Sequence, residues 1–319
     1  MQKLVSVIIP TYNRADRIVK AIRSVKAQNY PAIQLIVADD GSHDNTAEII
    51  ARFEDVEYFY QENKGQGAAR NLGLKHAKGE YIASLDSDDI WDENFLTVAV
   101  EALENYEADF VFLNYTETSG NEEQLNGWEK SNDWKKYPKK INDEWTFLNG
   151  RQVRQLFLKT CPAPSSALLI RRTSFVAPWN EEMKIADDWC LILEMVLAKE
   201  CRAAFTMAHY WSKNVHTDNI YHGREKIGVI KDLGLHDEPM IAKKFSKELT
   251  IAEKAVLQKR IAGHYLNLGR LNLQKDGFSM KHISSIATAF KLAPLGSVFY
   301  IMQLSYYFLK NQLRIAQHK

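Results

Sequence analysis

Three carboxylates stand within four residues at Asp86-Ser87-Asp88-Asp89, directly after a short apolar run over residues 81–85. Like charges this close repel one another and disfavour joint ionisation unless a cation lies between them. Hard divalent cations prefer oxygen ligands and keep coordination positions open for substrate phosphates. A solvated acidic turn is the alternative, and the position at a strand end favours the metal site.

A second acidic turn, Asp39-Asp40-Gly41-Ser42, follows the apolar run 34–38. Asp-Gly is common turn chemistry, so a plain turn is one interpretation. The strand before it is expected to lie beside residues 4–9 in the sheet, which places Asp40 next to Tyr12. A flat aromatic ring and a carboxylate that accepts an N–H are what a pyrimidine base needs.

Alternating strands and helices are predicted to position these turns. Apolar runs and 3.6-residue spacing predict strands over 4–9, 34–38, 56–60 and 81–85, and helices over 15–28, 45–53 and 67–77. Such alternation indicates parallel βαβ units, whose ligands bind at the carboxyl ends of the strands. The residues Tyr12, Asp40 and Asp88 are therefore expected at one edge of the sheet.

The sequence pattern changes twice in the rest of the chain, first to a polar stretch and later to a continuous helical pattern. Residues 116–150 are polar, rich in Trp, Asn and Lys, and predict a long surface excursion over the active site. A strand over 166–170, a helix over 188–199 and a strand over 203–210 follow. After Tyr221 the pattern is helical throughout, which predicts a catalytic domain over 1–223 and a helical region over 224–319.

Composition describes a folded protein with an uneven charge distribution. The chain has 319 residues, 45% hydrophobic and 25% charged, with a net charge of +1. Residues 1–223 carry 25 Lys+Arg against 33 Asp+Glu, whereas residues 224–319 carry 16 against 7. An acidic body with a basic tail indicates two separate tasks. We expect an anionic membrane surface, and no nucleic acid, as the partner of the tail.

The stretch 292–309 is apolar and aromatic, and Lys310 and Arg314 follow it. It is short and punctuated for a membrane span, so an interfacial helix on the inner leaflet or packing within the chain or a homo-oligomer is expected. The three cysteines lack a C-x-x-C pair and are read as ordinary buried thiols of a reducing compartment. The first residues lead directly into a strand without a signal peptide, which indicates a cytoplasmic protein.

Four motifs in order resemble family 2 glycosyltransferases with the GT-A fold. They are residues 5–14 (VSVIIPTYNR), 39–42 (DDGS), 63–71 (NKGQGAARN) and 86–89 (DSDD). The resemblance extends more loosely to about residue 220. It implies an α/β, Rossmann-like fold with a mostly parallel sheet flanked by helices, a UDP-sugar donor, and one divalent metal ion, Mn²⁺ or Mg²⁺.

The resemblance also implies roles for individual residues of the donor site. Pro10, Tyr12 and Asp40 would hold the uracil, with Asn13 in the same nucleotide site. Gly67 and Arg70 would lie near the diphosphate or sugar, and Asp86 would approach the ribose and donor sugar. Asp88 would bind the metal, and His216 lies where many relatives place a histidine near the metal or phosphates. The residues after His216 depart from the usual small pattern, so a surface-loop histidine is the alternative.

The segment Ala186-Asp187-Asp188-Trp189 resembles the family's Glu-Asp-Trp motif at a helix start. The resemblance makes Asp188 the general base that deprotonates the acceptor hydroxyl, with inversion at the anomeric carbon. Asp187 replaces the usual Glu, and its charge should raise the pKa of one of the pair, which suits a base. A helix N-cap is the alternative role. The segment 161–166 resembles the lining of the acceptor pocket.

The sequence therefore predicts an inverting hexosyltransferase that moves glucose, galactose or an N-acetylhexosamine from a UDP-sugar to a growing glycan. A lipid-linked oligosaccharide at the cytoplasmic membrane face is the expected acceptor, and a protein-bound glycan is the chief alternative. A sugar nucleotidyltransferase would show a basic Gly-rich loop after the first strand, where this chain has residues 10–13, PTYN. A non-catalytic nucleotide-binding module is the other rival.

Overall fold

The computed structural model describes residues 2–119, 122–125, 128, 145–216, 219–221, 224–276, 280–298 and 301–302. The chain forms two compact units, Met1–Gly223 and Arg224–Lys319. This division falls where the charge changes from acidic to basic. Each unit is described by itself.

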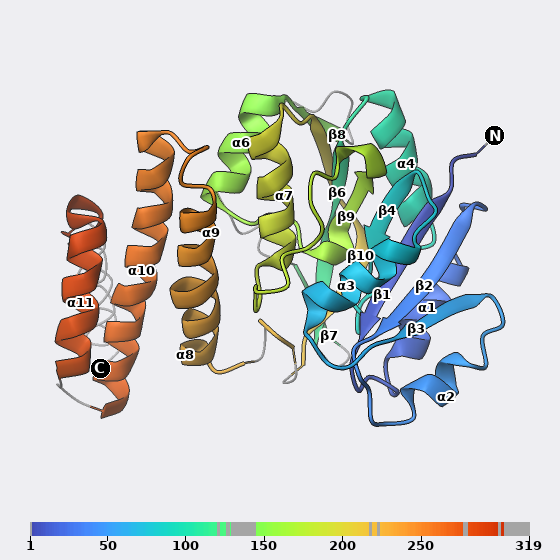
Figure 1. Ribbon diagram of the computed structural model, residues 1–319, viewed down its shortest axis with the longest axis horizontal. Coiled ribbons are helices and arrows are strands. Elements are labelled where there is room, and N and C mark those ends of the chain that lie inside the picture. The colour runs from blue at the N-terminus through green and yellow to red at the C-terminus, as the bar shows by residue number, and fades with distance from the viewer. Residues whose placement is uncertain are drawn as a thin grey trace, which may run out of the picture. The chain divides into compact units, whose positions relative to one another are not determined.

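The N-terminal unit is built on one ten-stranded sheet (Figure 1). Its order is β3-β2-β1-β4-β9-β6-β10-β5, with β7 paired to β6 and β8 paired to β10. The strands are β1 (Val5–Thr11), β2 (Ile33–Asp39), β3 (Val56–Tyr60), β4 (Tyr81–Ser84), β5 (Ile90–Trp91), β6 (Phe110–Ser119), β7 (Glu122–Leu125), β8 (Trp145–Leu148), β9 (Leu168–Arg171) and β10 (Ala203–Asn214).

The predicted α/β fold is confirmed, and the sheet has a parallel half and a mixed half. The strands β3, β2, β1 and β4 pair in parallel. In the second half β6 and β10 are parallel, while β9 runs antiparallel to both β4 and β6, and β5 and β8 run antiparallel to β10. The chain leaves β1 toward β2 on one side and meets β4 on the other, which is the arrangement that places ligands at the carboxyl end of β1.

Helices pack against this sheet (Figure 1). They are α1 (Ile18–Lys26), α2 (Thr46–Ile50), α3 (Gln66–His76), α4 (Phe95–Asn105), α6 (Gly150–Lys159) and α7 (Asp187–Ala198), with short 3₁₀ turns at Ser165–Ala167 and Arg172–Ser174. Apolar spacing explains their positions, because α1 buries Ile18, Ile22 and Val25 on one face. The helix α3 packs on β1 and β2, and α4 packs on β6, β9 and β10.

The first strand continues through Pro10, which the sequence pattern treats as its end. Pro10 pairs with Ala38 of β2, and Thr11 pairs with Asp39. The pairing of β1 with β4 stops at Ile8, so Pro10 lies where β1 has a single neighbouring strand. A proline without an N–H is tolerated at such a position.

The expectation of one long surface excursion over 116–150 is wrong at both of its ends. Residues 116–119 complete β6, residues 122–125 form β7, and residues 145–148 form β8. Trp128 and Trp145 are buried, and Trp128 makes edge-to-face contacts with Phe112 and Phe205. Burial of these aromatic rings stabilises the described parts of the segment, although its polar sequence shows only weak strand periodicity. Residues 120–121, 126–127 and 129–144 lie outside the described residues.

The C-terminal unit is helical in its described part. Its elements are α8 (Lys226–Val229), a π-helical segment (Ile230–Asp237), α9 (Glu238–Lys244), α10 (Ile251–Asp276) and α11 (Met280–Leu292). Ala262 and Leu266 of α10 pack against Ala289 of α11. None of the helices in the described part of the chain combines the length and apolar character that crossing a membrane requires. Residues 299–300 and 303–309 of the apolar stretch lie outside that part.

The cysteines follow the prediction of buried thiols in two of three cases. Cys190 and Cys201 are buried, whereas Cys161 is exposed. Burial raises the pKa of the Cys201 thiol to about 12, so this group stays protonated and packs as an apolar side chain.

Gly79→Ala is expected to destabilise the N-terminal unit by about 2 to 3 kcal/mol through overpacking. A Cβ at this position would lie 2.5 Å from the Ser6 nitrogen and 2.7 Å from the Leu4 oxygen, and backbone atoms of a central strand cannot move aside. Urea unfolding followed by tryptophan fluorescence measures the effect, since all seven tryptophans precede residue 224. The matched control is Lys78→Ala, whose side chain is exposed. An unchanged unfolding midpoint in Gly79→Ala would contradict the close approach.

Candidate active site

The carboxyl ends of β1 and β2 bring two predicted nucleotide residues together. The Asp40 N–H donates to the Thr11 oxygen at 2.9 Å, so Tyr12 and Asp40 leave neighbouring strand ends. The Tyr12 ring is 43% exposed, and an aromatic ring open to solvent can stack on a base. Asp40 is buried beside it.

The Asp40 carboxylate also holds the loop between β3 and α3. Its Oδ1 accepts from Gln61 Nε2 at 2.7 Å and from the Lys64 N–H at 2.9 Å, and its Oδ2 accepts from the Gly65 N–H at 2.7 Å. Gly65 has φ +99°, a conformation that favours glycine at the start of α3. A carboxyl group can accept several hydrogen bonds, and Asp40 accepts these three from the protein, so its contact with a base stays a prediction.

Three other predicted donor-site residues make contacts within the protein. Asn13 has φ +50°, donates its N–H to Ser42 Oγ and accepts from the His43 N–H, both at 2.8 Å. Pro10 is buried in β1. Gly67 is buried in α3, where a Cβ would lie 3.1 Å from the Asn180 oxygen. These residues set the shape of the loops around Tyr12 and Asp40, and their contact with a nucleotide stays a prediction.

Arg70 is the centre of a buried ion network. Its guanidinium, 3% exposed, pairs with Asp86 Oδ1 at 2.6 Å and with Asp187, and its Nε donates to Ser84 Oγ at 3.2 Å. Gln66 of α3 donates to the second oxygen of Asp187. Burial opposes the charge, but Asp187 and Asp86 raise the pKa of Arg70 above its ordinary value. The network joins α3, the end of β4 and the first turn of α7.

Asp187 and Asp188 occupy the first turn of α7 but have different partners. Asp187 is 1% exposed and is bound by Arg70 and Gln66, so it is neither a simple helix cap nor open to substrate. Asp188 is partly exposed; its Oδ2 accepts from the Ser165 N–H at 3.1 Å and its Oδ1 from the Trp189 N–H at 2.6 Å. Asp187 is therefore held inside the protein, whereas Asp188 is partly exposed, and the role of either residue in proton transfer stays a prediction.

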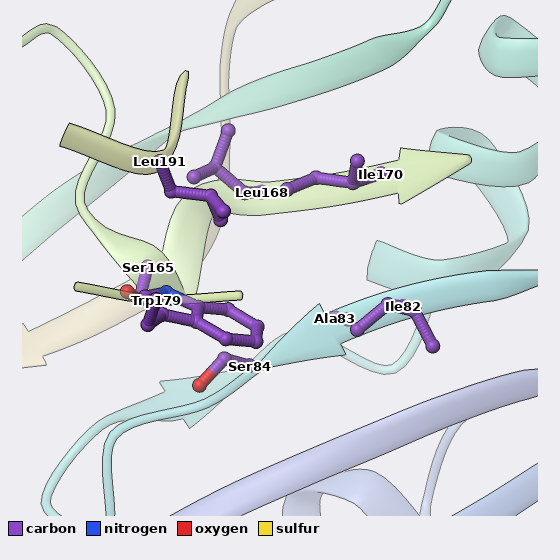
Figure 2. Close-up of a pocket in the computed structure, with 8 residues that line it drawn as sticks. All are labelled: Ile82, Ala83, Ser84, Ser165, Leu168, Ile170, Trp179 and Leu191. Atoms are coloured by element: carbon purple, nitrogen blue, oxygen red, sulfur yellow. The ribbon is translucent and has the colours of Figure 1, made fainter. Parts of the chain in front are cut away.

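The pKa of Asp188 is raised to about 7, first by burial and then by the negative charge of Asp187. A small pocket is lined by Ile82, Ala83, Ser84, Ser165, Leu168, Ile170, Trp179 and Leu191 (Figure 2). Its lining is predominantly apolar, and Ser165, which binds Asp188, forms part of it. Burial disfavours the charged form of a carboxyl, and a pKa near neutrality suits a general base.

The three carboxylates of residues 86–89 contact different partners. Asp86 pairs with Arg70, and Asp88 Oδ2 lies 2.8 Å from His216 Nε2. Asp89 turns inward, where it accepts from Ser166 Oγ at 2.7 Å and from the Asn214 N–H at 3.3 Å. Burial and the charges of Asp86 and Asp88 raise the pKa of Asp89 well above its usual range. Asp89 is therefore a structural residue.

Asp88 and His216 form the pair that could hold a metal ion. Asn219 supports both, since its Nδ2 donates to Asp88 Oδ2 at 3.2 Å and its Oδ1 accepts from the His216 N–H at 2.6 Å. No cluster of three or more His, Cys, Asp or Glu side chains suited to a metal occurs among the described residues. A carboxylate such as that of Asp88 suits Mn²⁺ or Mg²⁺, which would keep positions for phosphate oxygens, and His216 Nε2 would be a second, nitrogen ligand.

Sequence reasoning missed several residues that this geometry uses. Gln66, Ser165, Ser166 and Asn219 each bind one of the predicted carboxylates. The segment 161–166 carried a signal through its resemblance to an acceptor-pocket lining. Single Gln and Asn residues such as Gln66 and Asn219 carry no such signal, because their partners are far away in sequence.

Asp40, Asp86 and Asp88, together with Tyr12, form a carboxylate-rich rim at the carboxyl ends of the strands. The fold and this rim agree with a nucleotide-sugar glycosyltransferase, and comparison with known proteins establishes the class. The family model "Glycosyl transferase family 2" matches residues 6–176, which include β1 to β4, Asp40, Arg70 and Asp88. The match covers more than half of the chain. The chain belongs to glycosyl transferase family 2, and it is a glycosyltransferase enzyme.

Curated relatives resemble part of the chain. Glycosyltransferase GlyG of Streptococcus pneumoniae is 40% identical over 129 residues, 38% of this chain and 43% of GlyG. The Escherichia coli UDP-Glc:alpha-D-GlcNAc-diphosphoundecaprenol beta-1,3-glucosyltransferase WfaP is 40% identical over 116 residues, 35% of this chain and 46% of WfaP. The chain spans less than half the length of these relatives.

Solved structures share the fold over most of the chain. TarS 1-349 of S. aureus in complex with UDP-GlcNAc has a TM-score of 0.62 at 18% identity, covering 90% of this chain and 79% of TarS 1-349. The mannosyltransferase PcManGT of Pyrobaculum calidifontis, in complex with GDP-Man and Mn²⁺, has a TM-score of 0.60 at 18% identity, covering 97% and 81%. At such identities the likeness shows the fold, and the predicted GT-A architecture is confirmed.

Proposed function

We propose that this enzyme transfers a hexosyl group from a UDP-sugar to a hydroxyl of a growing bacterial surface polysaccharide, with inversion at the anomeric carbon. The observation that carries the proposal is the position of Asp188. Its partly exposed carboxyl, with a pKa raised to about 7, is linked through Asp187 and Arg70 to Asp86 of the metal-site loop. A base and a nucleotide rim joined in one rigid network suit direct displacement.

In the proposed reaction Asp188 accepts the proton of the acceptor hydroxyl. The hydroxyl oxygen forms a bond to the anomeric carbon from the face opposite the nucleotide. The bond from that carbon to the β-phosphate oxygen breaks, and UDP leaves with the electron pair. Asp187 and Arg70 hold Asp188 and Asp86 at fixed separation during this step. A divalent cation bound by Asp88 and His216 would supply positive charge to the leaving diphosphate.

The donor assignment has support from the site and from relatives. Tyr12 and Asp40 offer a stacking ring and an N–H acceptor at one strand edge, which suits uracil. The name of WfaP gives UDP-glucose as its donor, and the TarS complex contains UDP-GlcNAc. PcManGT was solved with GDP-Man, so a guanine nucleotide is the comparison that a donor test must include.

The name of one relative supports a lipid-linked acceptor, and the name of another supports a bacterial surface polysaccharide. The acceptor in the name of WfaP is a diphosphoundecaprenol, and TuaG of Bacillus subtilis, 37% identical over 118 residues, is named as a putative teichuronic acid glycosyltransferase. A lipid-linked glycan would present its hydroxyl at the inner face of the cell membrane. Transfer to a protein-bound glycan is the alternative.

We propose that the helical region 224–319 places the enzyme at this membrane surface from the cytoplasmic side. Ile283 and Ile286 of α11 are exposed, whereas Ala289 of the same helix packs on α10. Residues 254–319 carry ten Lys+Arg and one acidic residue, a charge that anionic lipids attract. The alternative is a homo-oligomer that covers the same face.

Co-sedimentation with lipid vesicles tests the membrane proposal. The enzyme should pellet with phosphatidylglycerol vesicles at low salt, remain in the supernatant with phosphatidylcholine vesicles, and dissociate as salt screens the charge. A stable dimer in size-exclusion chromatography without vesicle binding would favour the oligomer.

Asp88→Asn is expected to weaken Mn²⁺ binding at least tenfold and to abolish metal-dependent release of UDP. Electron paramagnetic resonance of free Mn²⁺ measures binding directly, apart from turnover. UDP release is followed with UDP-glucose, UDP-galactose, their N-acetylamino forms and GDP-mannose, with Mn²⁺ or EDTA. Asp92→Asn, an exposed acid directly after β5, serves as control and should bind Mn²⁺ as the wild type does. Equal Mn²⁺ affinity in Asp88→Asn would place the metal elsewhere, and turnover of GDP-mannose alone would overturn the UDP assignment.

A further inference from the structure

Arg17 lies against the histidine of the proposed metal pair. Its Nη1 is 2.9 Å from His216 Nδ1 and 3.0 Å from His216 Nε2. Arg17 directly precedes α1, whereas His216 follows β10, so 199 residues separate them in sequence. The fold thus brings a permanent cation to the rim, at a position that no sequence motif marked.

The guanidinium is part of a continuous polar chain. His216 Nε2 lies 2.8 Å from Asp88 Oδ2, so Arg17, His216 and Asp88 follow one another along the rim. Arg17 Nε also lies 3.2 Å from the carboxylate of Asp16, which is 69% exposed.

Binding of a nucleotide-sugar donor would add negative charge to the rim, which favours a nearby cation. The diphosphate of a nucleotide sugar brings about two negative charges to a rim that already carries Asp86 and Asp88. Arg70 is buried and shared between Asp86 and Asp187, so its charge is already matched. Arg17, with a side chain 24% exposed, contacts His216, which in turn contacts Asp88. A guanidinium binds phosphate oxygens through two parallel N–H donors.

We propose that Arg17 binds the diphosphate of the nucleotide-sugar donor directly, beside the cation at Asp88 and His216. This inference rests on the proposed donor function of the rim. In the structure the guanidinium contacts His216; with the donor bound, it exchanges this contact for phosphate oxygens. Arg17 then adds to the positive charge that the leaving UDP meets and gives the enzyme metal-independent affinity for the diphosphate.

Isothermal titration with uridine, UMP and UDP, in EDTA and in Mn²⁺, tests the inference on the full chain. Arg17→Gln should raise the Kd for UDP in EDTA about tenfold, the effect of one charge-assisted phosphate contact, and leave the Kd for uridine unchanged. Arg17→Lys should bind UDP with intermediate affinity, since it keeps the charge but loses the paired donors. The control is Arg23→Gln, an exposed arginine in the last turn of the same helix, which should match the wild type.

The outcomes separate this inference from the proposed function. Equal UDP affinity in wild type and Arg17→Gln overturns the role of Arg17 and leaves the donor assignment standing. A loss of uridine affinity equal to the loss for UDP assigns the effect to the base site and also overturns the inference. If the wild type binds no UDP with or without Mn²⁺, the proposed donor is wrong and the inference fails with it.

Discussion

Asp188→Asn should lower kcat by about 10²- to 10⁴-fold, the usual contribution of a general base, and leave UDP affinity within about twofold. The amide keeps the shape of the carboxyl but cannot accept the acceptor proton. The wild-type rate should rise with pH and level off above an apparent pKa of about 7, because only the deprotonated Asp188 is active. Steady-state kinetics between pH 5 and 9, together with UDP titration, measure both effects.

The same substitution should raise stability, with a defined pH dependence. The native pKa of Asp188, about 7, exceeds the ordinary Asp value of about 3.9, so the unfolded chain releases this proton first. Stability associated with Asp188 is therefore lost as pH rises toward 7. Asp188→Asn removes this loss. We expect the free energy of unfolding to rise by about 1 to 2 kcal/mol at pH 8, which corresponds to a few degrees in Tm, and to rise by less at pH 5.

The control for Asp188 is Glu182→Gln, an exposed acid in the loop before α7. It should change neither kcat nor the pH profile. Full activity in Asp188→Asn, with the wild-type pH profile, would show that another group accepts the proton.

Arg70→Met should destabilise the N-terminal unit by about 3 to 5 kcal/mol and lower Tm by about 10 °C. The substitution leaves Asp187, which is 1% exposed, and Asp86 without their buried counter-charge. The stability of Arg70→Lys should lie between that of the wild type and that of Arg70→Met, because an ammonium keeps the charge but cannot bridge two carboxylates in a fixed plane. Urea unfolding followed by tryptophan fluorescence reports these values.

A double-mutant cycle identifies the cause of this loss. Adding Asp187→Asn to Arg70→Met should recover part of the stability, because it removes one of the uncompensated buried charges. The exposed Arg52→Met is the matched control and should unfold within about 0.5 kcal/mol of the wild type. Strictly additive effects of the two substitutions would argue against the ion pair as the origin of the stabilisation.

Local patterns predicted the N-terminal half of the fold well. The run 56–60 is the strand β3, and the expected helix over 67–77 is α3 (Gln66–His76) within one residue. Such elements follow from apolar periodicity because one face of each packs against its sequence neighbours. The pattern failed over 116–119, 122–125 and 145–148, where strands pair with β6 and β10. The strand β8 pairs with β10, which lies far away in sequence, whereas β7 pairs with the end of β6 directly before it. The polar residues of 116–119 and 122–125 do not show the apolar spacing from which the other strands were predicted.

The sequence by itself determined the family, the strand-end positions of Tyr12, Asp40 and Asp88, and the helix start that carries Asp188. Short motifs encode these features, since strand ends and helix starts depend on adjacent residues. Tertiary structure decided the role of each carboxylate. Asp187 and Asp86 share Arg70, Asp89 turns inward to Ser166, and Asp88 meets His216. Burial and partner charge set the state of an ionisable group, and both arise only when distant segments pack together.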